Sequence, residues 1–144
     1  MFIPVIPDNS LTKEISEIVQ LSQKLENEYN FEFAPPLAEE KITAWEIEHS
    51  IKIPESIKEW LRFSGYSSIC NDLVIIRGVD GFVTDCRFVP DDMVIIGSLI
   101  DASISIGFSK ETGSILREDH GEITEISSFA DFLRDPVIRK LKKS

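Results

Sequence analysis

The tripeptide His120-Gly121-Glu122 is the first candidate for chemistry, because it matches half of the signature of zinc-dependent deaminases. In those enzymes a histidine and two cysteines hold the zinc ion, and the glutamate transfers protons. The companion Pro-Cys-x-x-Cys segment is missing from this sequence. The tripeptide also falls where the pattern of the chain predicts a hairpin turn. We therefore interpret it as a turn, and we predict no metal site and no cofactor.

Asp91 and Asp92 are the next candidates, because paired carboxylates can act as general acid and base. Neighbouring residues of an extended segment point to opposite faces, so these two carboxylates cannot flank one bond. His49 ends a predicted helix, where the helix dipole favours it, and we interpret it as structural. The sequence contains no nucleophile elbow, P-loop or dinucleotide fingerprint. We predict a protein that is not an enzyme and has no catalytic residues.

Cys70 and Cys86 are the only cysteines, so this chain alone cannot form a disulfide framework or a four-cysteine metal site. We interpret both as small hydrophobic residues that are buried or lie on strands. The alternative is a functional pair of thiols.

A cluster of acids interleaved with apolar residues offers a different kind of site, a surface for binding another protein. Carboxylates around an aromatic or aliphatic centre suit a basic partner, because charge steers the encounter and buried apolar groups hold the complex. The alternative is that these acids only keep the domain soluble. Phe88 and Met93 lie within the same stretch, and the candidate partner-binding residues are Asp80, Phe82, Asp85, Asp91, Asp92 and Asp101.

Composition supports binding of a protein over binding of nucleic acid. The 144 residues carry 25 acids and 15 bases, a net charge of −10, whereas a phosphate backbone demands a basic surface. No apolar run approaches the length of a membrane span, and the N-terminus lacks the pattern of a secretory signal, so we expect a cytoplasmic protein. Residues 135–144 form a basic tail, expected to be solvated and frayed, with contact to a membrane or RNA as the alternative.

The elements that must position these residues follow from hydrophobic periodicity. Apolar spacings of three and four predict helices over residues 11–25, with Asn9-Ser10 as cap candidates, over 37–49, and from Pro54 to a stop at Gly65. The pattern then becomes extended and β-branched, which predicts a meander of strands. The expected strands are residues 73–76, 82–83, 87–89, 93–96, 103–108, 114–117 and 122–126.

Two hairpin turns and a closing helix complete the pattern. Residues 110–113 and 119–121 are expected to join neighbouring strands, and the alternation over residues 103–106 predicts one buried and one polar face. Ser128 and Asp131 fit a variant capping box at the start of a helix that Pro136 interrupts. The predicted fold is α+β, with N-terminal helices packed against a twisted, mainly antiparallel sheet and closed by a C-terminal helix.

The order of several motifs resembles the SUKH superfamily, whose members include fungal regulators of cell-wall assembly and bacterial immunity proteins of polymorphic toxin systems. The resemblance covers about residues 37–134, and residues 1–144 are expected to form one SUKH-like domain with residues 1–36 as an N-terminal helix and link. Ile53 stands where leucine is usual, and a single glycine follows the third helix where a pair is common. The motifs lie at residues 38–46, 53–61, 65, 96–97, 112–122 and 127–133, with Trp45, Pro54, Trp60, Gly65 and Phe132 as markers of the fold.

This resemblance implies an α+β domain that works by binding. Family members of the immunity type neutralise a cognate toxin domain, often a nuclease, by direct contact, and such basic partners would suit an acidic chain. The expected partner is therefore a basic toxin domain, with no direct contact to nucleic acid. The alternative is a regulatory scaffold that binds a cellular protein. The family carries no common catalytic residues to this sequence.

Overall fold

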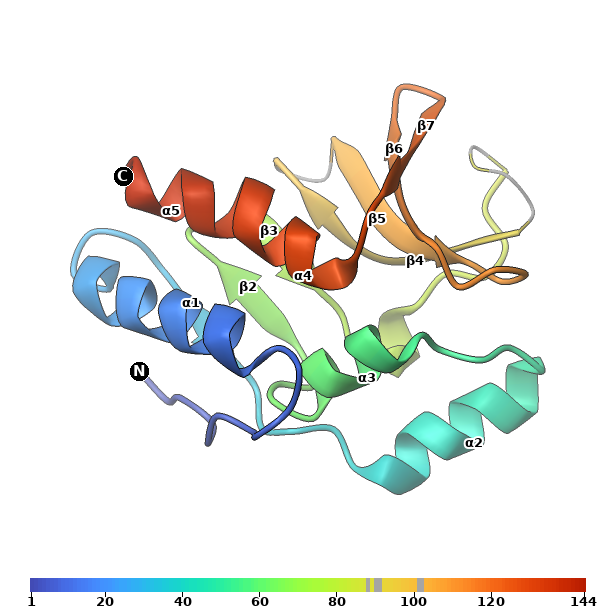
Figure 1. Cartoon of the computed structure of the whole chain (residues 1–144), viewed down its shortest axis with the longest axis horizontal. Coiled ribbons are helices and arrows are strands. Elements are labelled where there is room, and N and C mark those ends of the chain that lie inside the picture. The colour runs from blue at the N-terminus through green and yellow to red at the C-terminus, as the bar shows by residue number, and fades with distance from the viewer. Residues whose placement is uncertain (88, 90–91, 101–102) are drawn as a thin grey trace.

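The computed structural model describes residues 1–144 except 88, 90–91 and 101–102, and its centre is a sheet in which every strand pairs with its neighbours in the chain (Figure 1). All pairings are antiparallel. The sheet is open, and within the described residues its strands are β1 (Glu32–Phe33), β2 (Ser67–Ile69), β3 (Val74–Ile76), β4 (Met93–Leu99), β5 (Ile104–Ser109), β6 (Ile115–Asp119) and β7 (Glu122–Ile126). The predicted meander and its two hairpins are confirmed.

Helices pack against one face of the sheet, which we call the inner face (Figure 1). A wide π-type turn, η2, joins the last two helices because Pro136 lacks the N–H that a regular helix needs at that position. The elements are α1 (Thr12–Leu25), α2 (Glu39–His49), α3 (Glu55–Leu61), the short 3₁₀ helix η1 (Val79–Gly81), α4 (Phe129–Phe132), η2 (Leu133–Ile138) and α5 (Arg139–Lys142). The α+β fold predicted from the sequence is confirmed.

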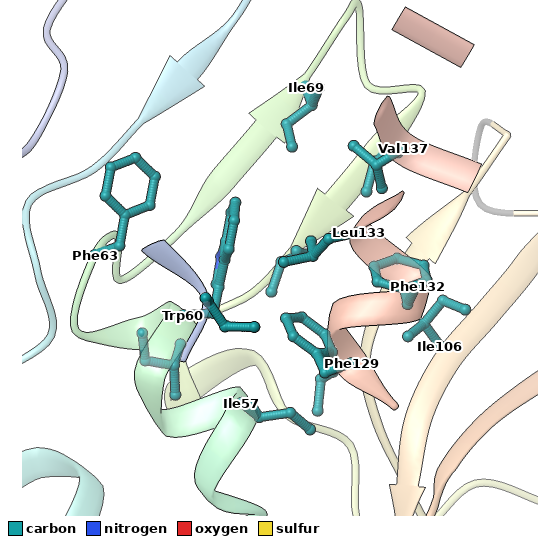
Figure 2. Packing of buried hydrophobic residues seen from close by; sticks show 14 of the residues in the cluster. Ile57, Trp60, Phe63, Ile69, Ile106, Phe129, Phe132, Leu133 and Val137 are labelled. Carbon is teal, nitrogen blue, oxygen red and sulfur yellow. The ribbon is translucent and has the colours of Figure 1, made fainter. Parts of the chain in front are cut away.

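Aromatic residues from α3 and α4 meet at the centre of the core between helices and sheet (Figure 2). Trp60 is fully buried, its ring lies 5.3 Å from that of Phe63, and its indole N–H donates to Ser67 Oγ at 3.1 Å. Figure 2 shows Phe132 of α4 facing Ile106 of β5. The hydrogen bond from the Trp60 indole to Ser67 fixes the position of α3 on the sheet, because an unpaired indole N–H inside this aromatic cluster would be costly.

The buried carboxylate of Glu59 ties α3 to the start of α1. Glu59 Oε2 accepts a hydrogen bond from the Ser10 backbone N–H at 2.7 Å, and Oε1 accepts one from Ser10 Oγ at 2.6 Å. Leu11 directly precedes α1, and its backbone N–H donates to Asn9 Oδ1 at 2.8 Å. Leu11 therefore occupies the N-cap position, and the two residues expected to cap the helix precede it. Asn9 accepts a hydrogen bond from Leu11, and Ser10 donates to Glu59 of α3.

Three local predictions are wrong. Residues 82–83 form no strand, and only a single bridge joins Val83 to Ile95. Of the expected strand 87–89, residue 88 lies outside the described residues, and the Val89 N–H donates to Cys86 O at 3.2 Å and not to a strand. Ser67 and Ser68 lie on β2, in a part of the chain for which the sequence predicts no strand. The third helix, α3, ends at Leu61 and not at Gly65, and Gly65 has no positive φ. Its Cβ position would lie 3.0 Å from Pro35 O, so close backbone approach explains the glycine.

The basic C-terminal segment is also ordered, contrary to the expectation of a frayed tail. Val137, Ile138 and Leu141 are buried in the core, and Lys142 Nζ lies 2.7 Å from Glu17 Oε1 of α1. The apolar spacing of these three residues holds the helix onto α1, which leaves its cations on the outside. The capping box that starts this region is confirmed, because the Asp131 N–H donates to Ser128 Oγ at 3.0 Å.

Candidate partner-binding surface

The structure describes three of the five acids predicted to form one partner-binding surface, and their exposure differs. Asp80 is exposed in η1, and Asp85 is exposed in the following loop. Asp92 is half-buried, where its Oδ2 accepts a hydrogen bond from Ser109 Oγ at 3.0 Å. Asp91 and Asp101 lie outside the described residues, as does Phe88. Asp80 and Asp85 therefore remain on the surface, while Asp92 helps to hold the loop against β5.

Phe82 does not form the apolar centre that the sequence suggested. Its side chain is 9% exposed, and its ring packs edge-on against Trp45 of α2 with 5.4 Å between centroids. Trp45 also stacks on His49, whose Nδ1 lies 2.9 Å from Trp45 O. Phe82 thus belongs to the contact that holds α2, and His49 has the structural role predicted for it.

The face of the sheet opposite the helices, called here the outer face, provides an apolar centre instead. Strand register places one row of side chains on it across all seven strands of the described sheet, namely Glu32, Ser68, Ile75, Ser98, Ser105, Glu118 and Ile123. Ile75, Ser105, Glu118 and Ile123 are half-buried, whereas the neighbouring inner row contains the fully buried Phe33, Ile76 and Ile106. Ser68 and Ser98 of the outer row are buried.

A second outer row adds aliphatic surface beside the first. It pairs Val83, Ile95, Gly107, Leu116 and Glu125 in sequence across the strands. Val83 and Leu116 are half-buried, whereas Ile95 and Gly107 between them are buried. The outer face therefore combines isoleucine, valine and leucine side chains with small hydroxyls, which favours contact with a flat protein surface.

Acids border this face at both ends. Glu32, Ser68 and Asp72 line one hollow of about 590 Å³, and Ile75, Arg77 and Asp80 line another of about 540 Å³ together with Tyr66. Asp72 accepts a hydrogen bond from Ser68 Oγ. Glu118 lies next to Ile123, which is the other end of the row, and its Oε1 accepts from the Gly121 N–H at 2.7 Å. The charge of this border is predominantly negative.

Tyr66 reports on the electrostatics of the surface. Burial raises the pKa of its hydroxyl above the ordinary value, and the negative charges of Glu32 and Asp72 raise it further, while Arg77 lowers it. These are the effects expected when the phenolate would form beside carboxylates, because like charge disfavours ionisation. The outer face at Tyr66 is therefore a place where added negative charge is disfavoured and a cation from a partner would be favoured.

The other candidates for chemistry lie in a turn or at buried and half-buried positions. His120 is exposed in the β6–β7 turn with a positive φ of 53°, and its Nδ1 lies 2.5 Å from Asp119 Oδ1. Burial raises the pKa of the Cys70 thiol, and Cys86 is half-buried. Within the part of the chain that the structure describes, no three histidine, cysteine or acidic side chains gather to hold a metal ion, and no helix there is long and apolar enough to cross a membrane.

Sequence reasoning named Asp80, which lies at the border of the outer face, but did not place aliphatic side chains on that face. The alternation over residues 103–106 predicted that Ser105 points away from the core, and the register confirms this placement. Ile75 and Leu116 carried no such signal, because an aliphatic residue in a short strand fits either face. Comparison with known proteins adds no family to these observations, since no protein-family model and no curated protein matches the sequence.

Proposed function

We propose that this protein is a non-enzymatic binding domain that neutralises a cognate toxin domain in the cytoplasm, in the manner of bacterial immunity proteins. The outer face of the sheet carries this proposal, because it combines half-buried aliphatic side chains with a negative border. The resemblance to the SUKH superfamily supports the same function. A basic toxin domain, such as a nuclease, would complement both the local charge and the net charge of −10.

The two parts of the surface have different physical tasks in this proposal. Carboxylates such as Glu32 and Asp80 raise the rate of encounter with a basic partner, because long-range attraction orients the two molecules before contact. Aliphatic residues such as Ile75 and Ile123 then lose their contact with water in the complex, which slows dissociation. A toxin whose basic substrate-binding site covers this face would be excluded from its own substrate.

Coexpression tests the proposal directly. We would express the protein beside each C-terminal domain encoded by neighbouring genes in the source genome, and score rescue of growth and co-purification. We expect one of these domains to stop growth when it is expressed alone. The protein should restore growth in its presence by forming a stable one-to-one complex with it. If every neighbouring domain is harmless and unbound, the immunity function is wrong, and affinity purification of cellular partners tests the regulatory scaffold instead.

Surface variants then locate the interface. The triple variant Glu32→Gln, Asp72→Asn, Asp80→Asn should slow association at least about tenfold, because three rim charges are lost while their shapes are kept. Ile75→Thr keeps the β-branched shape and should weaken affinity about tenfold through faster dissociation. Both rates are measured by biolayer interferometry against the partner found by coexpression.

A matched control removes the same charge elsewhere. Glu26, Glu40 and Glu48 are exposed on or beside α1 and α2, so changing all three to glutamine alters the net charge equally without touching the outer face. The control should bind within about threefold of the unmodified protein, because distant exposed charges are screened. Equal loss in both triple variants would mean that net charge, and not this face, determines binding.

A further inference from the structure

A groove with a positively charged lining lies on the inner side of the β6–β7 hairpin, between the hairpin and the C-terminal helices. Figure 1 shows this hairpin projecting beyond the helical layer. The groove has a volume of about 600 Å³, and Arg117 and Thr124 of the hairpin form one wall while η2 and α5 form the other. Register places Arg117 and Thr124 directly opposite each other on the inner face, next to Ile106. The groove shares Glu125 with the outer face described above, and its other lining residues do not belong to the two outer rows.

Five of the 15 cationic residues of this acidic chain line the groove: Arg117, Arg134, Arg139, Lys140 and Lys143. Two of them are engaged in ion pairs, Arg134 with Asp131 at 2.5 Å and Arg139 with Asp135 at 3.1 Å. Arg117, Lys140 and Lys143 make no ion pair within the described residues. The lining therefore has a positive excess in a molecule whose net charge is −10.

The hairpin wall of the groove ends in a free strand edge. β7 is the last strand of the described sheet and pairs with β6 on one side alone. In an antiparallel ladder every second residue turns its N–H and C=O away from its partner strand, so alternate residues of β7 present unpaired backbone groups. Thr124, Glu125 and Ile126 belong both to this edge and to the lining of the groove. An added strand would lie beside the cations of η2 and α5.

We propose that this groove binds an extended acidic peptide segment of a partner protein, which pairs with the β7 edge and places alternate carboxylates beside Arg117, Lys140 and Lys143. Backbone hydrogen bonds to β7 supply affinity that does not depend on sequence, and the alternation of a strand puts every second side chain on the groove side. Four residues of strand span about 13 Å. This inference is independent of the proposed function, which concerns the outer face and a basic partner.

The edge favours a peptide over a simple anion. A phosphate would use the cations and leave the backbone groups of β7 unpaired, whereas an extended peptide uses both features at once. Leu99, Ile100 and Pro136 add apolar surface to the same lining, which suits side chains of a peptide better than a small, strongly hydrated ion. Charge also selects against this protein's basic partners, because the groove repels them.

Fluorescence anisotropy with the intact protein tests the proposal. The probe is a labelled acetyl-Glu-Val-Glu-Val-Glu-Val peptide, and the control probe replaces each glutamate with lysine. We expect saturable binding of the glutamate peptide and none of the lysine peptide. Arg117→Gln, Lys140→Gln and Lys143→Gln should each weaken binding about threefold, because each removes one exposed charge pair. A control triple variant, Lys13→Gln, Lys24→Gln, Lys41→Gln, removes three exposed cations elsewhere and should change affinity less than twofold.

Backbone methylation of the peptide separates strand pairing from charge attraction. Two further probes carry N-methyl groups on all glutamates or on all valines, so that only one probe loses the N–H groups facing β7. We expect one methylated probe to bind as the parent does and the other to lose binding at least about tenfold. Equal affinity of both, together with complete displacement of the parent by inorganic tripolyphosphate, would show an anion site alone and overturn the proposal.

A second copy of this chain is the remaining occupant to distinguish. If sedimentation velocity shows a dimer that the glutamate peptide dissociates, the β7 edge pairs with itself and the proposal is overturned. A monomer that binds one peptide supports it. Absence of peptide binding by a monomer also overturns it, because the groove and edge are present in the unmodified protein.

Discussion

At the scale of single residues, Tyr66 links burial to the charge of the outer face. Burial is the largest cause of its raised pKa, and the negative charges of Glu32 and Asp72 raise the pKa further, whereas Arg77 lowers it. Tyr66 therefore senses the same negative border that we propose to attract a basic partner.

The ultraviolet titration of Tyr66 tests this electrostatic description. Tyr29→Phe leaves Tyr66 as the single tyrosine of the chain, and its pKa should lie above that of a free tyrosine. Glu32→Gln should lower this pKa and Arg77→Gln should raise it, while Glu48→Gln on α2 should leave it unchanged. An unshifted pKa in all variants would contradict the negative border.

The sign of the effect on stability follows from linkage. Because the folded pKa of Tyr66 is raised, the folded state keeps its proton at a pH where the unfolded state has lost it. The contribution of this group to stability is thus complete below the pKa of unfolded tyrosine, near 10, and decreases as the pH rises through the folded pKa. Tyr66→Phe should flatten the decrease in unfolding free energy over that range.

At the scale of elements, the central strands approach one another so closely that side chains are excluded at two positions. A Cβ atom on Gly107 of β5 would lie 1.9 Å from Val94 O, and one on Gly97 of β4 would lie 2.0 Å from Ile75 O. Both neighbours are backbone atoms of paired strands, which cannot turn aside as a side chain would. Gly97 also follows the point where the β4–β5 register shifts.

Gly107→Ala should therefore lower the unfolding free energy by about 2 kcal/mol or more, since the new methyl group forces β4 and β5 apart. Equilibrium urea unfolding measures this change. Ser105→Ala is the matched control two residues away on the same face of β5, and it should cost less than about 0.5 kcal/mol. Equal stability of the two variants would rule out the close approach.

The elements that the sequence predicted best are those whose cause is local. Glycine turns define the hairpins, and the alternating residues of β5 define its two faces, so both were evident before the structure. β2 was missed because Ser67 and Ser68 look like loop residues, yet Ser67 is buried as the acceptor for Trp60. The apolar centre of the outer face was missed for a related reason, because its residues come from strands far apart in the chain.

At the scale of the whole molecule, charge is divided between two sides. The outer face has an acidic border, and the groove beside β7 has a cationic lining, although the net charge is −10. Exposed carboxylates in excess repel one another in the folded state, and dissolved salt screens that repulsion. The net charge follows directly from the composition, but its division does not, because the cations of α5 were expected on a frayed tail and instead are held beside the hairpin.

Added salt should consequently stabilise the folded protein. Raising sodium chloride from about 0.02 to about 0.3 M should increase the thermal midpoint by about 3 °C, because the Debye length shrinks from about 20 Å to less than 10 Å. Circular dichroism follows the transition. The variant Glu26→Gln, Glu40→Gln, Glu48→Gln carries less excess charge and should show a smaller increase. A midpoint that falls with salt would mean that attractive pairs outweigh the repulsion.

The order of the strands also bears on how the molecule forms. Because each strand from β2 to β7 pairs with the next one along the chain, most of the ladder closes through short loops and small losses of chain entropy. The slow contacts are the others: β1 must reach β2 across α2 and α3, and α1 must meet the C-terminal helix from the opposite end of the chain. The hairpins can therefore form early in folding, and the helices that bury their inner face pack onto them last.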